Sequence, residues 1–167
     1  MQVVEFYRGE RGNQNGDKLE DILKWTNGQL EMDHDYVQWM FPSNEMSMLN
    51  GEAPTLAKHE SDIFKADPAL QAKVKESLVR FLEFLDFKLT EDGETVKVDP
   101  KDENIPWWLR GAFNHNCLRM TRLLKCLRLT GLDRYAVAVY DCLREFKDKV
   151  STNTWGYWHG AVFEPLW

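Results

Sequence analysis

Apolar residues recur at helical spacing over the longest patterned stretch of the chain. The stretch begins at Asp67-Pro68, a cap residue followed by proline at the first helical position, and runs to about Asp86. Its apolar positions are Leu70, Val74, Leu78, Phe81, Leu82 and Leu85. These residues fall on one side of a helix, so the stretch predicts a long amphipathic helix.

The same spacing predicts two further helices in the second half of the chain. One extends from about residue 114 or 116 to 130, with Gly131 as its terminator, and the other from about 133 to 149. The residues expected to face inward are Leu118, Met120, Leu123, Leu124 and Leu127 in the first helix, and Ala136, Val137, Val139, Tyr140, Leu143 and Phe146 in the second.

Turn and cap signals divide the first third of the chain into short elements. Asp17, three residues before Glu20, predicts a capped helix that Asn27-Gly28 ends. A second helix is predicted from Asp33 to Phe41, because Pro42 disfavours helical geometry in the residue before it. The other expected elements are an extended segment at 3–7, loops at 9–16 and 43–56, and a short helix at about 58–65.

A change of period after residue 86 predicts a small hairpin. Phe87 and Leu89 alternate before a turn at Asp92-Gly93, and Val96 and Val98 alternate after it. We therefore expect a mainly α, single-domain helical bundle with at most a small β-hairpin. Its expected parts are an extended N-terminal segment and loop (1–16), a helical domain (17–149) and an aromatic C-terminal tail packed on that domain (150–167).

Composition narrows the class of protein. The 167 residues are 43% hydrophobic and 29% charged, as in a soluble globular domain, and the net charge of −6 makes a nucleic-acid partner unlikely. No apolar run approaches the roughly 18 residues of a membrane span, so we expect a soluble, intracellular chain with no transmembrane segment. Three cysteines without a CxxC pattern favour a reducing compartment, with no disulfide framework or zinc site.

The stretch DHDYVQWMFP, residues 33–42, carries the first candidate chemistry. Asp33, His34 and Asp35 are consecutive, so on a helix their side chains diverge and cannot converge on one ion. Aspartate at a helix start caps unpaired N–H groups. We therefore expect these aspartates to cap, and we expect no metal and no cofactor.

Two polar pairs invite a common interpretation. His34 and Gln38 share a helix face, as do His115 and Arg119, and we expect the two pairs to meet inside the bundle while Trp39 shields them. Two readings stay open. The groups form a buried hydrogen-bonded network, or they form an anion pocket in which Arg119 and Arg122 offer fork-shaped donors.

Three other residue sets have a structural and a functional interpretation. Cys117 lies two residues from His115, on a different side of a helix, so a structural thiol is expected rather than a nucleophile. The basic run, which is either a solvated face or a docking patch for an acidic partner, is Arg110, Arg119, Arg122, Lys125 and Arg128. The aromatic residues that fill a core or line a peptide groove are Trp107, Trp108, Trp155, Tyr157, Trp158, Phe163 and Trp167.

Two segments resemble motifs of a known family. HDYVQWMFP (34–42) is similar to the pattern H-x-Y-I-Q-W-L-F-P, and NHNCLRMTRLLKCL (114–127) to N-H-x-Y-L-R-I-T-R-I-L-K-S-L. Between them, FKADPALQ (64–71) follows the pattern F-x-x-D-P-x-L-Q. The family is the conserved region of the opioid growth factor receptor, and the resemblance covers about residues 15–147. Cys117 departs from it, because the family usually has an aromatic residue there.

The resemblance implies a largely helical, non-enzymatic domain that binds a peptide or protein. Animal members are associated with the nucleus and its envelope and bind an enkephalin peptide, which implies an enkephalin-like partner and a nuclear or perinuclear location. The ligand-binding candidates among the matching positions are His34, Gln38, Trp39, Asn114, His115, Arg119 and Arg122.

Three hypotheses of function follow. The first is a peptide-binding module in which an aromatic groove supplies contact area and Arg119 and Arg122 receive a carboxylate. The second is a small metal-assisted hydrolase using His34, His115 and Asp35. The third is nucleic-acid contact through the basic helix.

Overall fold

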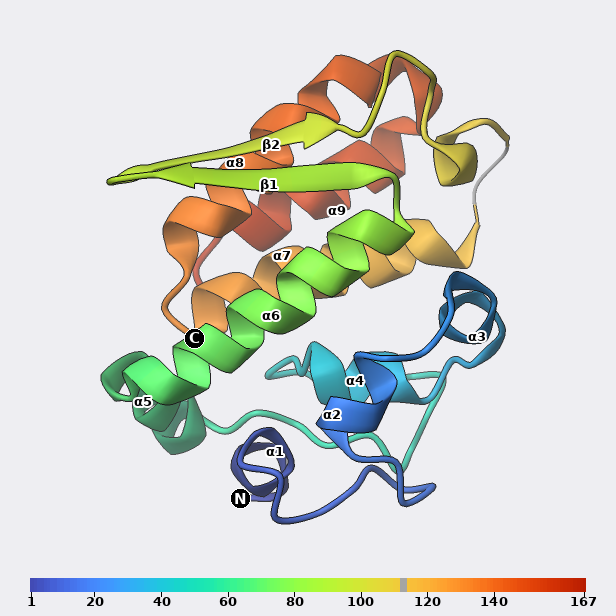
Figure 1. The fold of residues 1–167 in the computed structure, drawn as a ribbon. Helices are drawn as coiled ribbons and strands as arrows, with labels where there is room; N and C mark the ends of the chain where they lie inside the picture. Colours follow the sequence, from blue (N-terminus) through green and yellow to red (C-terminus); the bar gives the residue numbers. More distant parts are fainter. Residues whose placement is uncertain (112–113) are drawn as a thin grey trace.

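The computed structural model describes residues 1–111 and 114–167, a mainly helical domain that includes a two-stranded antiparallel hairpin (Figure 1). The predicted fold class is confirmed. In chain order the elements are α1 (Gln2–Tyr7), α2 (Leu19–Ile22), α3 (Asn27–Met32), α4 (Tyr36–Met40), α5 (Lys58–Ala66), α6 (Pro68–Phe84), β1 (Phe87–Asp92), β2 (Thr95–Pro100), the 3-10 helix η1 (Trp107–Leu109), α7 (His115–Leu129), α8 (Asp133–Leu143), the 3-10 helix η2 (Arg144–Lys149) and α9 (Thr152–Phe163).

The long helix α6 runs through the middle of the domain (Figure 1). Asp67 caps it as predicted, because its side chain accepts hydrogen bonds from the backbone N–H groups of Ala69 and Leu70. The apolar face packs against α1, α5 and β1. Its buried apolar residues are Leu70, Val74, Leu78, Phe81, Leu82 and Phe84.

The hairpin and the C-terminal helices form the other half of the core. β1 pairs with β2 in register from Phe87↔Pro100 to Asp92↔Thr95, and β2 lies against α8 (Figure 1). α7 ends where predicted, and Gly131 follows it with a φ of +83°, a left-handed conformation that suits glycine.

The aromatic tail is more regular than its sequence suggested. Residues 152–163 form α9, which packs on α7 and α8, and Ser151 caps it by accepting from the Thr154 N–H. Trp158 and Val162 are buried one turn apart, but aromatic residues on the other sides of the helix hid this period.

The extended segment predicted at residues 3–7 is wrong, because α1 is a helix. Val3, Val4, Phe6 and Tyr7 are all fully buried. They suggested a strand because β-branched and aromatic residues favour extended structure, but their i, i+1, i+3, i+4 spacing also fits one helix face. Contact with α5 and α6 overrides the local preference.

Two of the cap signals near residue 20 were also misplaced. Asp17 does not cap α2, whose N-cap is Lys18 without a side-chain bond. The backbone N–H of Asp17 donates instead to the Asn13 side chain at 2.9 Å, closing the preceding loop. Asn27, expected to end a helix, begins α3, because Thr26 and Gln29 form a capping box around it.

Three details of the later helices differ from the expectation. Leu118 on α7 is 46% exposed and Val137 on α8 is 40% exposed, although both were expected to face inward. The helix predicted at 133–149 stops at Leu143 and continues as η2, in which Phe146 leaves helical geometry. Leu118 is exposed because its side chain lines a groove on the surface, which is described below.

Candidate functional site

The two polar helix ends meet, as the sequence predicted. The His34 ring, just before α4, and the His115 ring, at the start of α7, pack edge to face with centroids 4.8 Å apart. The Nε2 atom of His115 lies 2.7 Å from Oε1 of Glu31 on α3. Burial, together with the neighbouring charges of Arg119 and His115, lowers the pKa of His34.

Arg119 is the centre of this cluster and is only 5% exposed. Its Nη1 donates to the Leu30 carbonyl at 3.0 Å, and its Nη2 donates to the Asp33 carbonyl at 2.8 Å. Nη1 also donates to Oδ1 of Asn116 at 3.3 Å. Arg119 therefore ties the α3–α4 connection to α7. This arrangement fits the interpretation of the polar residues as a buried hydrogen-bonded network. Because its donors are already bonded, Arg119 is poorly placed to receive a ligand.

The aspartates of DHD do not cap as predicted. Asp35 is the N-cap residue of α4, but its side chain accepts no bond from the helix. Asp33 accepts from the Asp35 N–H at 2.9 Å and so closes a turn before the helix. The amide nitrogen of Gln38 turns back to the carbonyls of His34 (2.9 Å) and Asp35 (3.1 Å), so Gln38 stabilises its own helix start.

Trp39 and Asn114 lie away from this cluster. Trp39 is 2% exposed, packs on Phe6, and donates through Nε1 to Gln14 at 3.0 Å, so it does not shield the polar pairs. Asn114 caps α7 through the Asn116 N–H and donates to the Trp108 carbonyl at 2.7 Å. Both side chains have structural roles at these positions.

A groove of about 710 Å³ opens beside the cluster, between α4, the loop at 43–50, α7 and α9. The loop supplies side chains that have no place in the core, with Met48 97% and Leu49 83% exposed. Leu118 of α7 and Tyr157 of α9, which is 64% exposed, line the same space. His34, Gln38, His115, Arg119 and Arg122 also line it. Five of the seven candidate residues are thus brought to one groove.

Arg122 differs from its neighbour Arg119. Its Nε and Nη2 atoms are buried and have no hydrogen-bond partner within residues 1–111 and 114–167. Burial lowers the pKa of its guanidinium. Lys125, one turn further along α7, is paired with Glu45 of the loop at 2.7 Å.

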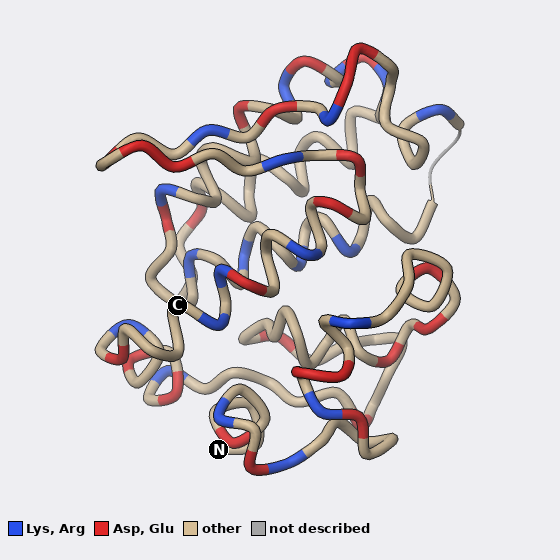
Figure 2. Tube along the Cα trace, in the orientation of Figure 1, with Lys and Arg blue, Asp and Glu red and all other residues tan. Residues whose placement is uncertain are grey.

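The basic run is not a solvated face. Arg119 is buried, and Arg128 donates to the carbonyls of Ala161 and Glu164, each at 2.9 Å, holding the end of α9. Charges of both signs are interspersed along the rest of the chain (Figure 2). The positive charge that the groove presents therefore comes from a few α7 positions in a chain of net charge −6.

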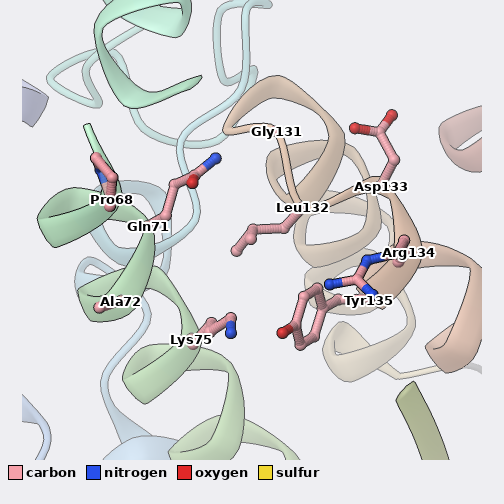
Figure 3. A pocket seen from close by; sticks show the side chains of 9 residues that line it. All are labelled: Pro68, Gln71, Ala72, Lys75, Gly131, Leu132, Asp133, Arg134 and Tyr135. Atoms are coloured by element: carbon pink, nitrogen blue, oxygen red, sulfur yellow. The ribbon is translucent and has the colours of Figure 1, made fainter. Parts of the chain in front are cut away.

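A second hollow, of about 410 Å³, lies between α6 and the start of α8. Figure 3 shows Gln71 and Lys75 facing Arg134 and Tyr135 across it. Lys75 pairs with Glu91 at 3.2 Å, Gln71 donates to the Thr130 carbonyl at 3.0 Å, and Arg134 donates to the Glu94 carbonyl at 2.6 Å. These polar groups already have partners, so they are better explained as contacts that hold the hairpin and α8 to α6.

Within residues 1–111 and 114–167, no group of three or more His, Cys, Asp or Glu side chains is placed to hold a metal ion. Across the same ranges, no helix is both long and apolar enough to cross a membrane.

The three cysteine thiols should be inert in the folded protein. Cys117, Cys126 and Cys142 are at most 4% exposed, and burial raises the pKa of Cys126 and of Cys142 to about 12. At pH 8 such a thiol is about one part in 10⁴ thiolate, the reactive form. We expect Ellman's reagent to label all three thiols in denaturant and to label native protein only on the timescale of unfolding. Rapid labelling of native Cys117 would revive it as a nucleophile.

The fold and the groove together define a small helical domain with exposed apolar side chains along one groove. The chain matches the opioid growth factor receptor conserved region over residues 1–149. It is 33% identical over 141 residues to the opioid growth factor receptor of Homo sapiens, covering 79% of this chain and 20% of the relative. It is also 33% identical over 130 residues to opioid growth factor receptor-like protein 1 of Xenopus tropicalis, covering 72% of this chain and 24% of the relative.

The chain belongs to the opioid growth factor receptor family. It spans between a fifth and a quarter of the length of these curated relatives. No significant match to a solved structure was found.

The sequence missed the loop residues of the groove. Met46, Met48 and Leu49 lie in an aperiodic, polar stretch, where periodicity cannot assign a face. The available signal was their composition, because three large apolar residues in a loop that cannot bury them call for another explanation.

Proposed function

We propose that this chain is a non-enzymatic peptide- or protein-binding module whose ligand lies in the groove beside α7. The exposed apolar lining carries this proposal, since Met48 at 97% and Leu49 at 83% exposure meet Leu118 and Tyr157 in one continuous space. Methionine-rich surfaces adapt to different partners, and contiguous exposed apolar surface marks interaction sites.

The family suggests the kind of ligand. The human relative is named as the receptor for opioid growth factor. An enkephalin-like peptide is the corresponding candidate for this chain, and a nuclear or perinuclear location is the corresponding proposal for its place in the cell.

Contact area in the groove comes from methionine and leucine more than from aromatic rings. Trp108 and Trp158, two of the proposed groove aromatics, are 2% and 0% exposed and belong to the core. Tyr157 lines the groove. The rival hydrolase is less well supported. The Asp35 carboxylate accepts from the Asn15 and Asn50 amides, at 3.4 and 3.5 Å, and within residues 1–111 and 114–167 it forms no hydrogen bond with His34 or His115.

A charge placed in the groove should weaken binding without affecting the fold. We expect Leu118→Glu to weaken binding of an enkephalin pentapeptide by about tenfold or more, because the carboxylate would be desolvated against the ligand. Isothermal titration calorimetry measures the change. The matched control is Val137→Glu, which is similarly exposed, at 40%, but lies on α8 away from the groove.

The control should bind as the original chain does, and both variants should unfold at nearly the original denaturant concentration. Undiminished binding by Leu118→Glu would place the ligand elsewhere. If the original chain does not bind the pentapeptide, enkephalin is not its ligand, and the same pair of variants then tests the groove with other peptides.

A further inference from the structure

The two unpartnered nitrogens of Arg122 have a particular geometry. Nε and Nη2 lie along one edge of the planar guanidinium, and their N–H bonds point in nearly parallel directions. The spacing of that edge matches the two oxygens of a single carboxylate, which it binds through two hydrogen bonds. The edge left without a partner is therefore the one suited to an acid.

Leaving this edge unpaired is energetically unfavourable. Both nitrogens are buried away from water, and a buried charge without a partner is strongly destabilised. A ligand that supplies the missing acceptors removes this penalty on binding. The neighbouring arginine cannot compete for such a ligand, because Arg119 is already bonded to Leu30, Asp33 and Asn116.

The same helix already shows how an acidic side chain is received. Oε1 of Glu45, a loop residue that lines the groove, lies 2.7 Å from Nζ of Lys125. Lys125 is three residues after Arg122, so the two cations occupy neighbouring positions on one helix face. The loop that lines the groove thus already places a side-chain carboxylate against α7.

We propose that Arg122 is an acid-binding subsite of the groove and takes the side-chain carboxylate of a glutamate or aspartate in the bound segment, next to apolar side chains that contact Leu118 and Met48. This inference rests on the proposed function, since it assigns the chemistry of the segment that occupies the same groove. Because both nitrogens are buried in the unbound chain, side chains that cover them must move aside for the acid to reach Arg122.

Three short peptides test this subsite. They are acetyl-Leu-Glu-Leu-amide, its neutral isostere acetyl-Leu-Gln-Leu-amide, and acetyl-Leu-Gln-Leu with a free C-terminal carboxylate. We expect the glutamate peptide to bind the original chain about tenfold more tightly than the glutamine peptide. In NMR titrations it should shift the Arg122 Nε–Hε signal and the methyl signals of Leu118 and Met48.

Variants assign the preference to Arg122. Arg122→Met, which keeps the length of the side chain without its charge, should reduce the preference for glutamate to about onefold. The control Arg144→Met removes an arginine that is 61% exposed and lies outside the groove, so the preference should remain. The shift of the Arg122 signal in the original chain needs no variant, so it stays informative if Arg122→Met folds poorly.

Other outcomes overturn the subsite or the groove separately. Equal binding of the glutamate and glutamine peptides with shifts at Leu118 and Met48 would overturn the subsite and leave the groove in place. Preference for the free C-terminus alone would overturn the assignment to a side chain. An Arg122 shift without any shift at Leu118 or Met48 would support anion binding and count against the groove, and no shift at any of the three would count against both.

Discussion

Replacing Arg119 with methionine should lower the free energy of unfolding by about 3–5 kcal/mol, the usual effect of breaking a buried charged network. The carbonyl of Asp33 and the Oδ1 atom of Asn116 would each lose the hydrogen bond that Arg119 donates. The Leu30 carbonyl would lose the same donor and keep the bond from the Tyr36 hydroxyl. Chemical denaturation followed by circular dichroism measures the change. A decrease of this size would remove a large part of the stability of a typical domain.

The matched control is Arg144→Met. Arg144 pairs with Asp141 at 3.3 Å, but both side chains are more than half exposed, so its replacement should change the stability by no more than about 0.5 kcal/mol. If Arg119→Met were as stable as this control and bound ligand poorly, Arg119 would be a ligand-binding residue, as the sequence first suggested. The structure supports the buried network instead.

The helices that the sequence located well are those with both a period and a cap. α6 has Asp67 and Pro68 at its start, and α7 has Asn114 before it and Gly131 after it. Such signals act within one turn of the chain, so they can be read without tertiary information. The sequences of α1 and α9 do not combine a clear period with a cap signal in this way. Contacts with other elements decide the conformation of α1 and the buried face of α9.

The candidate site was predictable to a similar extent. The shared faces of His34 with Gln38 and of His115 with Arg119 predicted that two distant segments meet, and the rings of His34 and His115 do. The periodicity of the sequence could not show which of the two candidate arginines has hydrogen-bond partners inside the protein. Arg119 and Arg122 are three residues apart on one helix, and only the backbone carbonyls at the α3–α4 connection, which the fold brings to Arg119, distinguish them.

Replacing Trp158 with alanine should destabilise the domain by about 3–5 kcal/mol, the usual range for truncating a buried tryptophan. Trp158 is 0% exposed, packs against Trp108 and Trp155, and donates through Nε1 to the Cys117 carbonyl at 3.0 Å. The substitution would leave a cavity between α9 and α7 and would remove the indole donor from the Cys117 carbonyl, which keeps its bond from the Thr121 hydroxyl. Thermal and chemical unfolding, both followed by circular dichroism, measure the effect.

The matched control for Trp158→Ala is a substitution at the neighbouring residue, Tyr157. Tyr157 is 64% exposed on a different side of α9 from Trp158, so Tyr157→Ala should change the stability by less than about 1 kcal/mol. α9 begins at Thr152, beyond the family match that ends at residue 149. A large effect at Trp158 beside a small one at Tyr157 would show that residues 150–167 are part of the folding unit, because an appended tail would leave the stability of the preceding helices unchanged in both variants.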